Sequence, residues 1–333
     1  MAKNRSLQRF DFAHDETDKL IEKIEAKVTK EYVKAAKETT KKLDKYMSRF
    51  KEESAKKLAE VKAGTLTREE YNKWLVNHVM IGKRWSDLRH NLAQDYVNAD
   101  KVAKRIVTGY MPDVYALNCN YATYTIEGAI NMSTGFTLYN HDAAERIIRE
   151  NPKILPGIGP RMKRKIAEGK AVKWQEGRIQ SATLQSIIQG ESIPNMAKRI
   201  CNEVGDAGKA DSIRYARTAA TSAENAGRLD AYKRVKDKGV NIKKMWVATL
   251  DSRTRHWHRE LDGQVADIDE PFQNEYGEIM YPGDPDADGA NIWNCRCAMR
   301  VQIEGFETDP EDLDLRNTEK LGDMTYEEWM ESL

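Results

Sequence analysis

The 333-residue sequence lacks any long uninterrupted apolar run, and its mean hydropathy is −0.74. A membrane-spanning helix needs about 20 consecutive, predominantly apolar residues, so the sequence predicts no membrane segment. The apolar stretch of a secretory signal is also missing from the first residues, which read MAKNRSLQRFDF. We therefore expect a protein that is made and used inside a cell.

Cysteine is scarce, with four in the whole chain: Cys119, Cys201, Cys295 and Cys297. So few cysteines in a chain of this length do not form a disulfide framework, which favours the reducing cytoplasm. The sequence also lacks a recognised nucleophile signature and a Gly-rich phosphate loop. These absences argue against the common enzyme classes.

Charge is abundant but unevenly distributed. Charged residues make up 32% of the chain and the net charge is +1, yet the segment from Glu304 to the end has eleven acidic and two basic residues. The rest of the chain is therefore basic by about ten charges. Residues 306–333 are expected to form an acidic tail with one short helix near YEEWMESL.

Apolar residues at helical spacing predict a long helix over residues 15–63, ended by Gly64. Thr67 and Glu70 have the spacing of a capping box, so a second helix should begin there and continue toward Val107. The two helices suggest an antiparallel hairpin over residues 1–110. Two interpretations stay open: an arm that docks on a partner, or two helices of an ordinary bundle.

The remaining chain divides into two further regions before the tail. Residues 111–174 predict a helical connector with a basic, Pro/Gly-rich segment, and helices resume over about 175–236. After Gly239 the pattern changes to short strands: KMWVATL, a hairpin turning at Asp262-Gly263, and a closing strand CRCAMRVQI. The predicted fold class is a mainly α N-terminal region with a long helical hairpin, followed by a small α+β C-terminal module spanning residues 175–305.

One cluster in this module has residue types that bind metal. His258, Cys295 and Cys297 are candidate zinc ligands, with Asp251 or His256 as the fourth. The competing interpretation is that both cysteines are small buried groups in the closing strand, which is the commoner fate of cysteine. A cysteine nucleophile with His258 as base, or a hydrolytic metal site with Asp251 and Glu260, is the enzymatic alternative.

A second feature is the segment LPGIGPRMKRKI at 155–166. It resembles the hairpin of helix-hairpin-helix DNA binders, which hold phosphate with backbone amides and basic side chains. The candidate DNA-contacting residues are Arg161, Lys163, Arg164 and Lys165. The alternative, which the short motif favours, is a plain basic linker that makes loose phosphate contacts.

The order of motifs from 190 to 301 resembles the phage head-morphogenesis family, the minor head proteins related to that of phage Mu. The matching pieces are, in order, GESIPNMAKRI, RTAATSAENAGRLDAY, MWVATLDSRTRHWHRELDGQ, YPGDP and NCRC. The residues that carry the family motif are Asp251, Arg253, Thr254, Arg255, His258, Asp262, Gly263, Asn294, Cys295, Arg296 and Cys297. Many relatives have His-Pro before Asn-Cys-Arg-Cys, whereas this chain has Ile292-Trp293, so one potential ligand is missing.

The resemblance implies a structural, non-enzymatic head component of a tailed phage or prophage. Such a protein is expected in the capsid interior near the portal, and in the host cytoplasm during procapsid assembly. The implied partners are the portal protein, the scaffolding protein and the major capsid protein, with nonspecific contact to packaged DNA and a role in DNA packaging or ejection. Most motif residues would then maintain the fold: Asp251 would cap the following helix, and Arg253 or Arg255 would pair with acidic neighbours.

Overall fold

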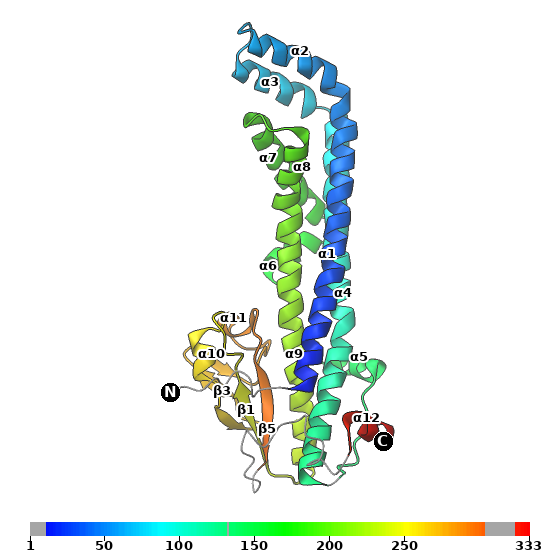
Figure 1. Ribbon diagram of the computed structural model, residues 1–333, viewed down its shortest axis with the longest axis vertical. Helices are drawn as coiled ribbons and strands as arrows, with labels where there is room; N and C mark the ends of the chain where they lie inside the picture. The colour runs from blue at the N-terminus through cyan, green and yellow to red at the C-terminus, as the bar shows by residue number, and fades with distance from the viewer. Residues whose placement is uncertain (1–10, 132, 304–323) are drawn as a thin grey trace. The chain divides into compact units, whose positions relative to one another are not determined.

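The computed structural model describes residues 11–131, 133–303 and 324–333 (Figure 1). These residues form two compact units that are interleaved along the sequence. Of the described residues, unit 1 comprises 11–24, 107–131, 133–157, 214–303 and 324–333, and unit 2 comprises 25–106 and 158–213. The predicted fold class, long N-terminal helices and a small C-terminal region with a few antiparallel strands, is confirmed. The functional assignment of the four predicted segments stays a prediction, and the part of the acidic tail before Met324 lies outside the described residues.

Nine α-helices precede the strands in the described chain. They are α1 (Phe12–Met47), α2 (Lys51–Lys62), α3 (Arg68–Val79), α4 (Lys83–Ile130), α5 (His141–Glu150), α6 (Pro160–Ile166), α7 (Ala171–Ile188), α8 (Ile193–Ile200) and α9 (Ala207–Asp237). The predicted capping box is present, because Thr67 accepts a hydrogen bond from the Glu70 amide and Glu70 accepts one from the Thr67 amide. A π-helical turn, Cys201–Asp206, joins α8 to α9.

Both predicted long helices are broken once. A 3-10 turn, Ser48–Phe50, separates α1 from α2. The second predicted helix ends at Val79, and α4 starts at Lys83 after Gly82, whose φ of +86° an L side chain rarely adopts. Beyond the predicted end, α4 continues through Pro112, where only one backbone N–H is lost. Neither break could be predicted from the sequence, because the helical spacing of apolar residues continues on both sides of each break.

Within unit 2, α1 and α4 form the predicted antiparallel hairpin. The Tyr32 hydroxyl donates to Asp100 at 2.6 Å, and the Thr39 hydroxyl donates to that of Tyr96 at 3.2 Å. The partner numbers fall along α4 as they rise along α1, so the helices run in opposite directions.

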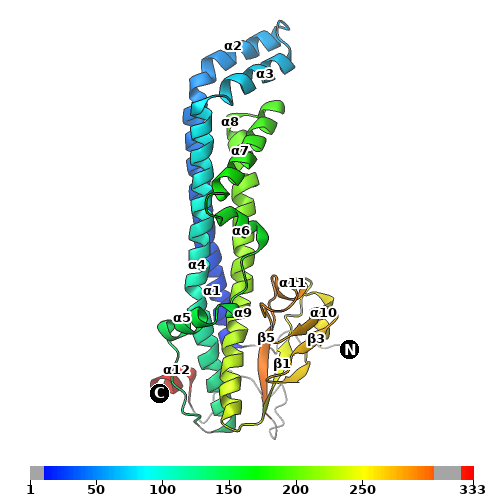
Figure 2. The same cartoon turned by 180° about the vertical axis from the view of Figure 1, so that it is seen from behind.

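The strands belong to unit 1 and lie beside its part of α9 (Figures 1 and 2). An antiparallel three-stranded sheet has the order β2-β1-β5, with β1 (Ile242–Val247), β2 (Val265–Asp267) and β5 (Ala298–Ile303). A separate hairpin consists of β3 (Phe272–Asn274) and β4 (Gly277–Ile279).

The hairpin predicted at Asp262-Gly263 is wrong. The residues before this turn form a short helix, α10 (His256–Glu260), and β2 pairs with β1 instead. The closing strand is confirmed as β5, although Cys295 and Cys297 lie just before it. Two more short helices complete the described chain: α11 (Gly289–Ile292) and α12 (Tyr326–Glu331), the helix predicted in the tail. None of the helices in the described ranges combines the length and apolar character required to cross a membrane.

Candidate metal centre

The three predicted zinc ligands are brought together in unit 1. His258 lies in the middle of α10, and Cys295 and Cys297 lie in the turn that leads into β5. Each of the three side chains is 2% exposed. Among the described residues they form the one group of His, Cys, Asp or Glu side chains whose ligand atoms are close enough to share a metal ion.

The distances within the cluster fit a tetrahedral site. The His258 Nδ1 lies 3.4 Å from the Cys297 Sγ and 3.7 Å from the Cys295 Sγ. Zinc bonds of about 2.3 Å to sulfur and about 2.0 Å to nitrogen place neighbouring ligand atoms roughly 3.5–3.8 Å apart. The Cys297 backbone N–H also donates to the Cys295 Sγ at 3.4 Å. The geometry and the donor set are therefore compatible with Zn²⁺.

The surroundings favour ionisation of one thiol before the other. A hydrogen bond from the Cys297 thiol lowers the pKa of Cys295 against the effect of burial, helped by the Cys297 amide and the charge of Arg255. The same hydrogen bond, together with burial, raises the pKa of Cys297. Cys295 is thus the first group of the pair to become a thiolate, the form that binds metal.

Neither predicted fourth ligand lies in the cluster. The Asp251 carboxylate accepts two hydrogen bonds of 2.7 Å from the Arg296 guanidinium, which hold the pKa of Asp251 well below its usual range. His256 is exposed and its Nε2 lies 3.1 Å from Glu275. Because these two histidines are two positions apart on a helix, only His258 points into the cluster, as the helical geometry requires. Three protein ligands, with a fourth position left for another donor, are what the described residues supply.

The other family-motif residues shape the turns around the ligands. Asp251 does not cap α10; it accepts hydrogen bonds from the Arg253 amide at 2.8 Å and from the Thr254 hydroxyl at 3.1 Å. Arg253 also makes a longer ion pair with Asp251, 3.6 Å, as expected for an acidic neighbour. Arg255 donates instead to the backbone carbonyl of Trp293, directly before the Asn-Cys-Arg-Cys segment.

Two further motif positions set the loop between β1 and β2. Asp262 accepts a hydrogen bond from the Ala248 amide at 2.8 Å. Gly263 has a φ of +81° and donates to the Trp246 carbonyl at 2.9 Å. Because α10 lies within this loop, the two hydrogen bonds tie the end of α10 to the end of β1 and so help to position His258.

Sequence inspection missed the role of α9, which supports the cysteine segment along its whole length. The Thr218 hydroxyl accepts from the Asn294 amide at 3.1 Å, and the Thr221 hydroxyl donates to the Cys295 carbonyl at 2.7 Å. Asn225 then donates to the Cys297 carbonyl at 3.1 Å and accepts from the Met299 amide at 2.9 Å.

Arg228 completes this row with a 3.0 Å hydrogen bond to the Met299 carbonyl. The four α9 positions are three, four and three residues apart, which places them on one helix face. The signal that could have found them is the recurrence of Thr, Asn and Arg at this spacing in a helix otherwise rich in alanine.

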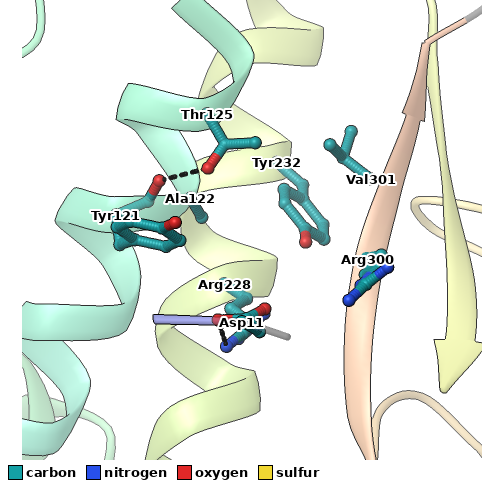
Figure 3. Close-up of a pocket in the computed structure, with 8 residues that line it drawn as sticks. All are labelled: Asp11, Tyr121, Ala122, Thr125, Arg228, Tyr232, Arg300 and Val301. Carbon is teal, nitrogen blue, oxygen red and sulfur yellow. Dashed lines mark hydrogen bonds and ion pairs between the residues drawn. The ribbon is translucent and has the colours of Figure 1, made fainter. Parts of the chain in front are cut away.

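Arg228 also belongs to a buried charge network at the start of the chain. Its guanidinium binds the Asp11 carboxylate at 2.5 and 2.9 Å and lies 3.2 Å from Glu224. Glu224 in turn accepts from His14 at 2.8 Å and, by its charge, raises the pKa of His14 to about 9. A small pocket between α4, α9 and β5 adjoins this network, with Tyr121, Tyr232 and Arg300 on its walls (Figure 3).

The candidate DNA-contacting residues lie on α6, in unit 2, away from the metal centre in sequence. Arg161, Lys163 and Arg164 are exposed. The prediction that Lys165 contacts DNA is wrong. Lys165 is 1% exposed, and its ammonium lies 2.8 Å from the Asp211 carboxylate. It faces the interior because α6 turns its fourth basic side chain toward α9.

The comparisons with known proteins point to a phage head component. Residues 177–300 match the family described as Phage Mu protein F like protein. This range includes the metal cluster and the α9 ladder, which is the row of hydrogen bonds from Thr218, Thr221, Asn225 and Arg228 to residues 294–299. The resemblance to the phage minor head protein family is thereby confirmed, and this similarity supports a structural role in the phage head and, with it, a place in the virion. No solved structure matches the chain.

Two curated relatives share most of this chain. Minor head protein GP7 of Bacillus phage SPP1 is 28% identical over 280 residues, which cover 79% of this chain and 86% of that protein. The NAD(+)--arginine ADP-ribosyltransferase EFV of Enterococcus faecalis is 28% identical over 240 residues, 70% of this chain. This chain covers only 46% of the transferase's length, so the name describes a protein about twice the size of the shared region. The family match and the similarity to GP7 support a structural role in the phage head, and the activity in the transferase's name is that of the relative.

Proposed function

We propose that this chain is a minor head protein that acts at or near the portal during procapsid assembly. The observation that carries the proposal is the similarity to Minor head protein GP7, which covers 79% of this chain and 86% of that protein and so extends beyond the C-terminal module into the helical part of the chain. The portal protein, the scaffolding protein and the major capsid protein are the proposed partners, and the capsid interior near the portal is the proposed location.

Unit 2 supplies the surface proposed to meet the portal. Large apolar side chains are exposed on it, with Ile81 at 60% and Ile188 at 61%. A groove of about 410 Å³ between the α2–α3 hairpin and α7–α8 is lined by Phe50, Leu75 and Met196, among others. Exposed apolar surface of this kind is typical of protein interaction sites.

Zinc is proposed as a structural ion that fastens α10 to the segment before β5. His258, Cys295 and Cys297 would hold it, with water or another donor as the fourth ligand. A bound ion would cross-link residues far apart in sequence and stabilise the folded module, as structural zinc does in other small domains.

Nonspecific contact with packaged DNA is proposed for unit 2. Its sequence ranges contain 30 Lys and Arg against 18 Asp and Glu, an excess that attracts phosphate. On α6 and α7, the guanidinium groups of Arg164 and Arg178 lie 5.9 and 5.1 Å from the ring of Trp174. Such contacts would accompany DNA packaging or ejection without reading its sequence.

Coexpression with the portal protein of the same genome tests the portal assignment. We expect the two proteins to copurify as a stable complex, measured by pull-down and by size-exclusion chromatography with light scattering. Deletion of residues 15–110 should abolish the complex, whereas Cys297→Ala should weaken the C-terminal module but leave the docking hairpin. No complex with the full chain, even with scaffolding protein added, would refute portal docking.

A further inference from the structure

The buried imidazole of His258 depends on two sulfur atoms for its polar contacts. Its Nδ1 lies 3.4 Å from the Cys297 Sγ and 3.7 Å from the Cys295 Sγ, while its Nε2 has no hydrogen-bond partner in the described chain. The ring centroids of Trp246 and Trp257 lie 5.7 and 6.4 Å from that of His258, and an indole N–H can only donate a hydrogen bond. Withdrawal of the two sulfurs would therefore leave the imidazole buried without a polar partner among the described residues.

The two sides of this cluster are anchored separately. Hydrogen bonds from α9 hold the backbone carbonyls of Cys295 and Cys297, so the two sulfurs can change partners while the backbone stays in place. The other side is α10, a helix of five residues that carries His258. The side chain of Arg255 ties the start of α10 to the Trp293 carbonyl. An ion shared by the three side chains would be the direct link between the two sides.

The two cysteines can also bond to each other. They are two positions apart in irregular backbone directly before β5, and both sulfurs face His258. The ligand atoms of the three residues all lie within 4.8 Å of one another. Residues at this sequence separation have Cα atoms at most about 7 Å apart, within the reach of a disulfide. A disulfide that closes so small a ring is strained, and strained disulfides are easily reduced again.

We propose that Cys295 and Cys297 form a redox switch that releases His258 and α10. The inference deepens the proposed zinc site, on which its metal-release step rests, by naming how that site is regulated. In the reduced state both sulfurs and the imidazole are available to one ion, whereas the disulfide leaves one protein donor. The reducing cytoplasm, where the head is proposed to assemble, keeps the switch open, and the oxidising surroundings of a released particle would close it.

Hydrogen peroxide is an oxidant that balances this reaction. One thiolate displaces hydroxide from the peroxide and becomes a sulfenic acid, and the second thiolate then displaces hydroxide from that sulfur. Two thiolates, one peroxide and two protons thus give one disulfide and two water molecules, and zinc leaves as the dication. Because a polar group buried without a partner is unfavourable, the imidazole and α10 should then move toward solvent.

The first experiment titrates the zinc-loaded full chain with hydrogen peroxide. A chromophoric chelator should record the release of one zinc ion per chain, and mass spectrometry should find the peptide with Cys295 and Cys297 lighter by two hydrogen atoms. Dithiothreitol and added zinc should reverse both changes. Cys201→Ser, at a cysteine outside the cluster, should behave like the wild type. Zinc release without this disulfide, or a treated chain that keeps its zinc, would overturn the proposal.

The second experiment follows the release of α10 by limited proteolysis with trypsin. Cleavage after Arg253 and Arg259, two exposed positions beside and within α10, should be at least tenfold faster in the oxidised chain, because cleavage follows the population of the open form. Cleavage after the exposed Lys62 of α2 should not change. Dithiothreitol should restore slow cleavage in the oxidised wild type but not in oxidised Cys297→Ser, which cannot form the disulfide. Equal rates in oxidised and reduced wild type would refute the release of α10.

These results separate the switch from the zinc site itself. If the purified chain binds no zinc, the proposed zinc site fails, while peptide mass and proteolysis still test the disulfide and the release of α10 in the metal-free chain. If zinc is bound and peroxide produces neither the disulfide nor faster cleavage, the zinc site stands and the switch is refuted.

Discussion

Asn225 pairs with Met299 in the way that a neighbouring strand would pair with the edge of β5. Its side-chain oxygen accepts from the Met299 amide at 2.9 Å while its amide nitrogen donates to the Cys297 carbonyl at 3.1 Å. The backbone hydrogen-bonding groups at this edge of the sheet are thereby paired with a helix. The pairing also holds the cysteine segment close to His258. The family match spans both partners of this contact.

Replacement of Asn225 by alanine should therefore destabilise unit 1. Two buried backbone groups would lose their partners, at about 1–3 kcal/mol each, so we expect the free energy of unfolding to fall by about 2–6 kcal/mol. Urea denaturation followed by circular dichroism measures this loss. Lys233→Ala, an exposed position on the same helix, serves as the matched control and should change stability by less than about 0.5 kcal/mol.

Zinc should be bound in a ratio of one ion per chain. Elemental analysis of protein purified without added metal should find it in the wild type and in Cys201→Ala, a cysteine outside the cluster. Cys297→Ala should remove it, and a chelator should lower the melting temperature of the wild type and of Cys201→Ala but not that of Cys297→Ala. Wild-type protein free of metal, with a melting temperature that a chelator does not change, would support buried structural cysteines instead.

The pH dependence of stability should report on Asp100 in unit 2. Burial raises its pKa to about 6, against the hydrogen bond from Tyr32 and the charge of Lys165. Asp211 and Gln175 also face this group. The folded state therefore binds a proton that the unfolded state releases, and the Asp100 contribution to stability rises as the pH falls from about 7 to 4.

Asp100→Asn removes this titration. We expect the variant to gain on the order of 2–3 kcal/mol relative to the wild type at pH 8, and to lose the advantage near pH 4. Subtracting the wild-type profile of unfolding free energy against pH from that of the variant isolates the contribution of Asp100. Other carboxylates cancel in this difference, for example Asp11, whose pKa is lowered by Arg228 and whose stabilising contribution is lost in acid. A difference that does not change with pH would contradict the assignment.

Contact with DNA should depend on the exposed face of α6. Changing Arg161, Lys163 and Arg164 to glutamine should weaken binding to duplex DNA regardless of its sequence, and should reduce the slope of log affinity against log salt by up to about three. Fluorescence anisotropy at several salt concentrations measures both quantities. A triple variant that retains the wild-type affinity and slope would show that α6 is only a linker.

Features that depend on a few neighbouring residues or on residue type could be predicted from the sequence. The capping box of Thr67 and Glu70 needs only its own four residues, and the metal-binding residue types alone predicted the cluster of His258, Cys295 and Cys297. The fourth ligand could not be predicted, because Asp251 is close in sequence but is held by Arg296.

Tertiary contacts account for the remaining differences. Lys165 has the same local sequence character as its exposed neighbours, and only the position of Asp211 on a distant helix decides that it is buried. The α9 ladder likewise required knowledge of which strand edge would face Asn225. The hairpin expected at Gly263 failed because that turn follows a helix and not a strand.

The composition of heads assembled with and without the portal tests the central claim most directly. Quantitative mass spectrometry of purified procapsids should find this chain at low copy number when the portal is present. Procapsids assembled in a portal-deletion strain should lack it, while the amounts of scaffolding and major capsid protein stay the same. Equal amounts of the chain in both kinds of particle would contradict a portal-associated minor head protein, and absence from both would contradict its place in the head.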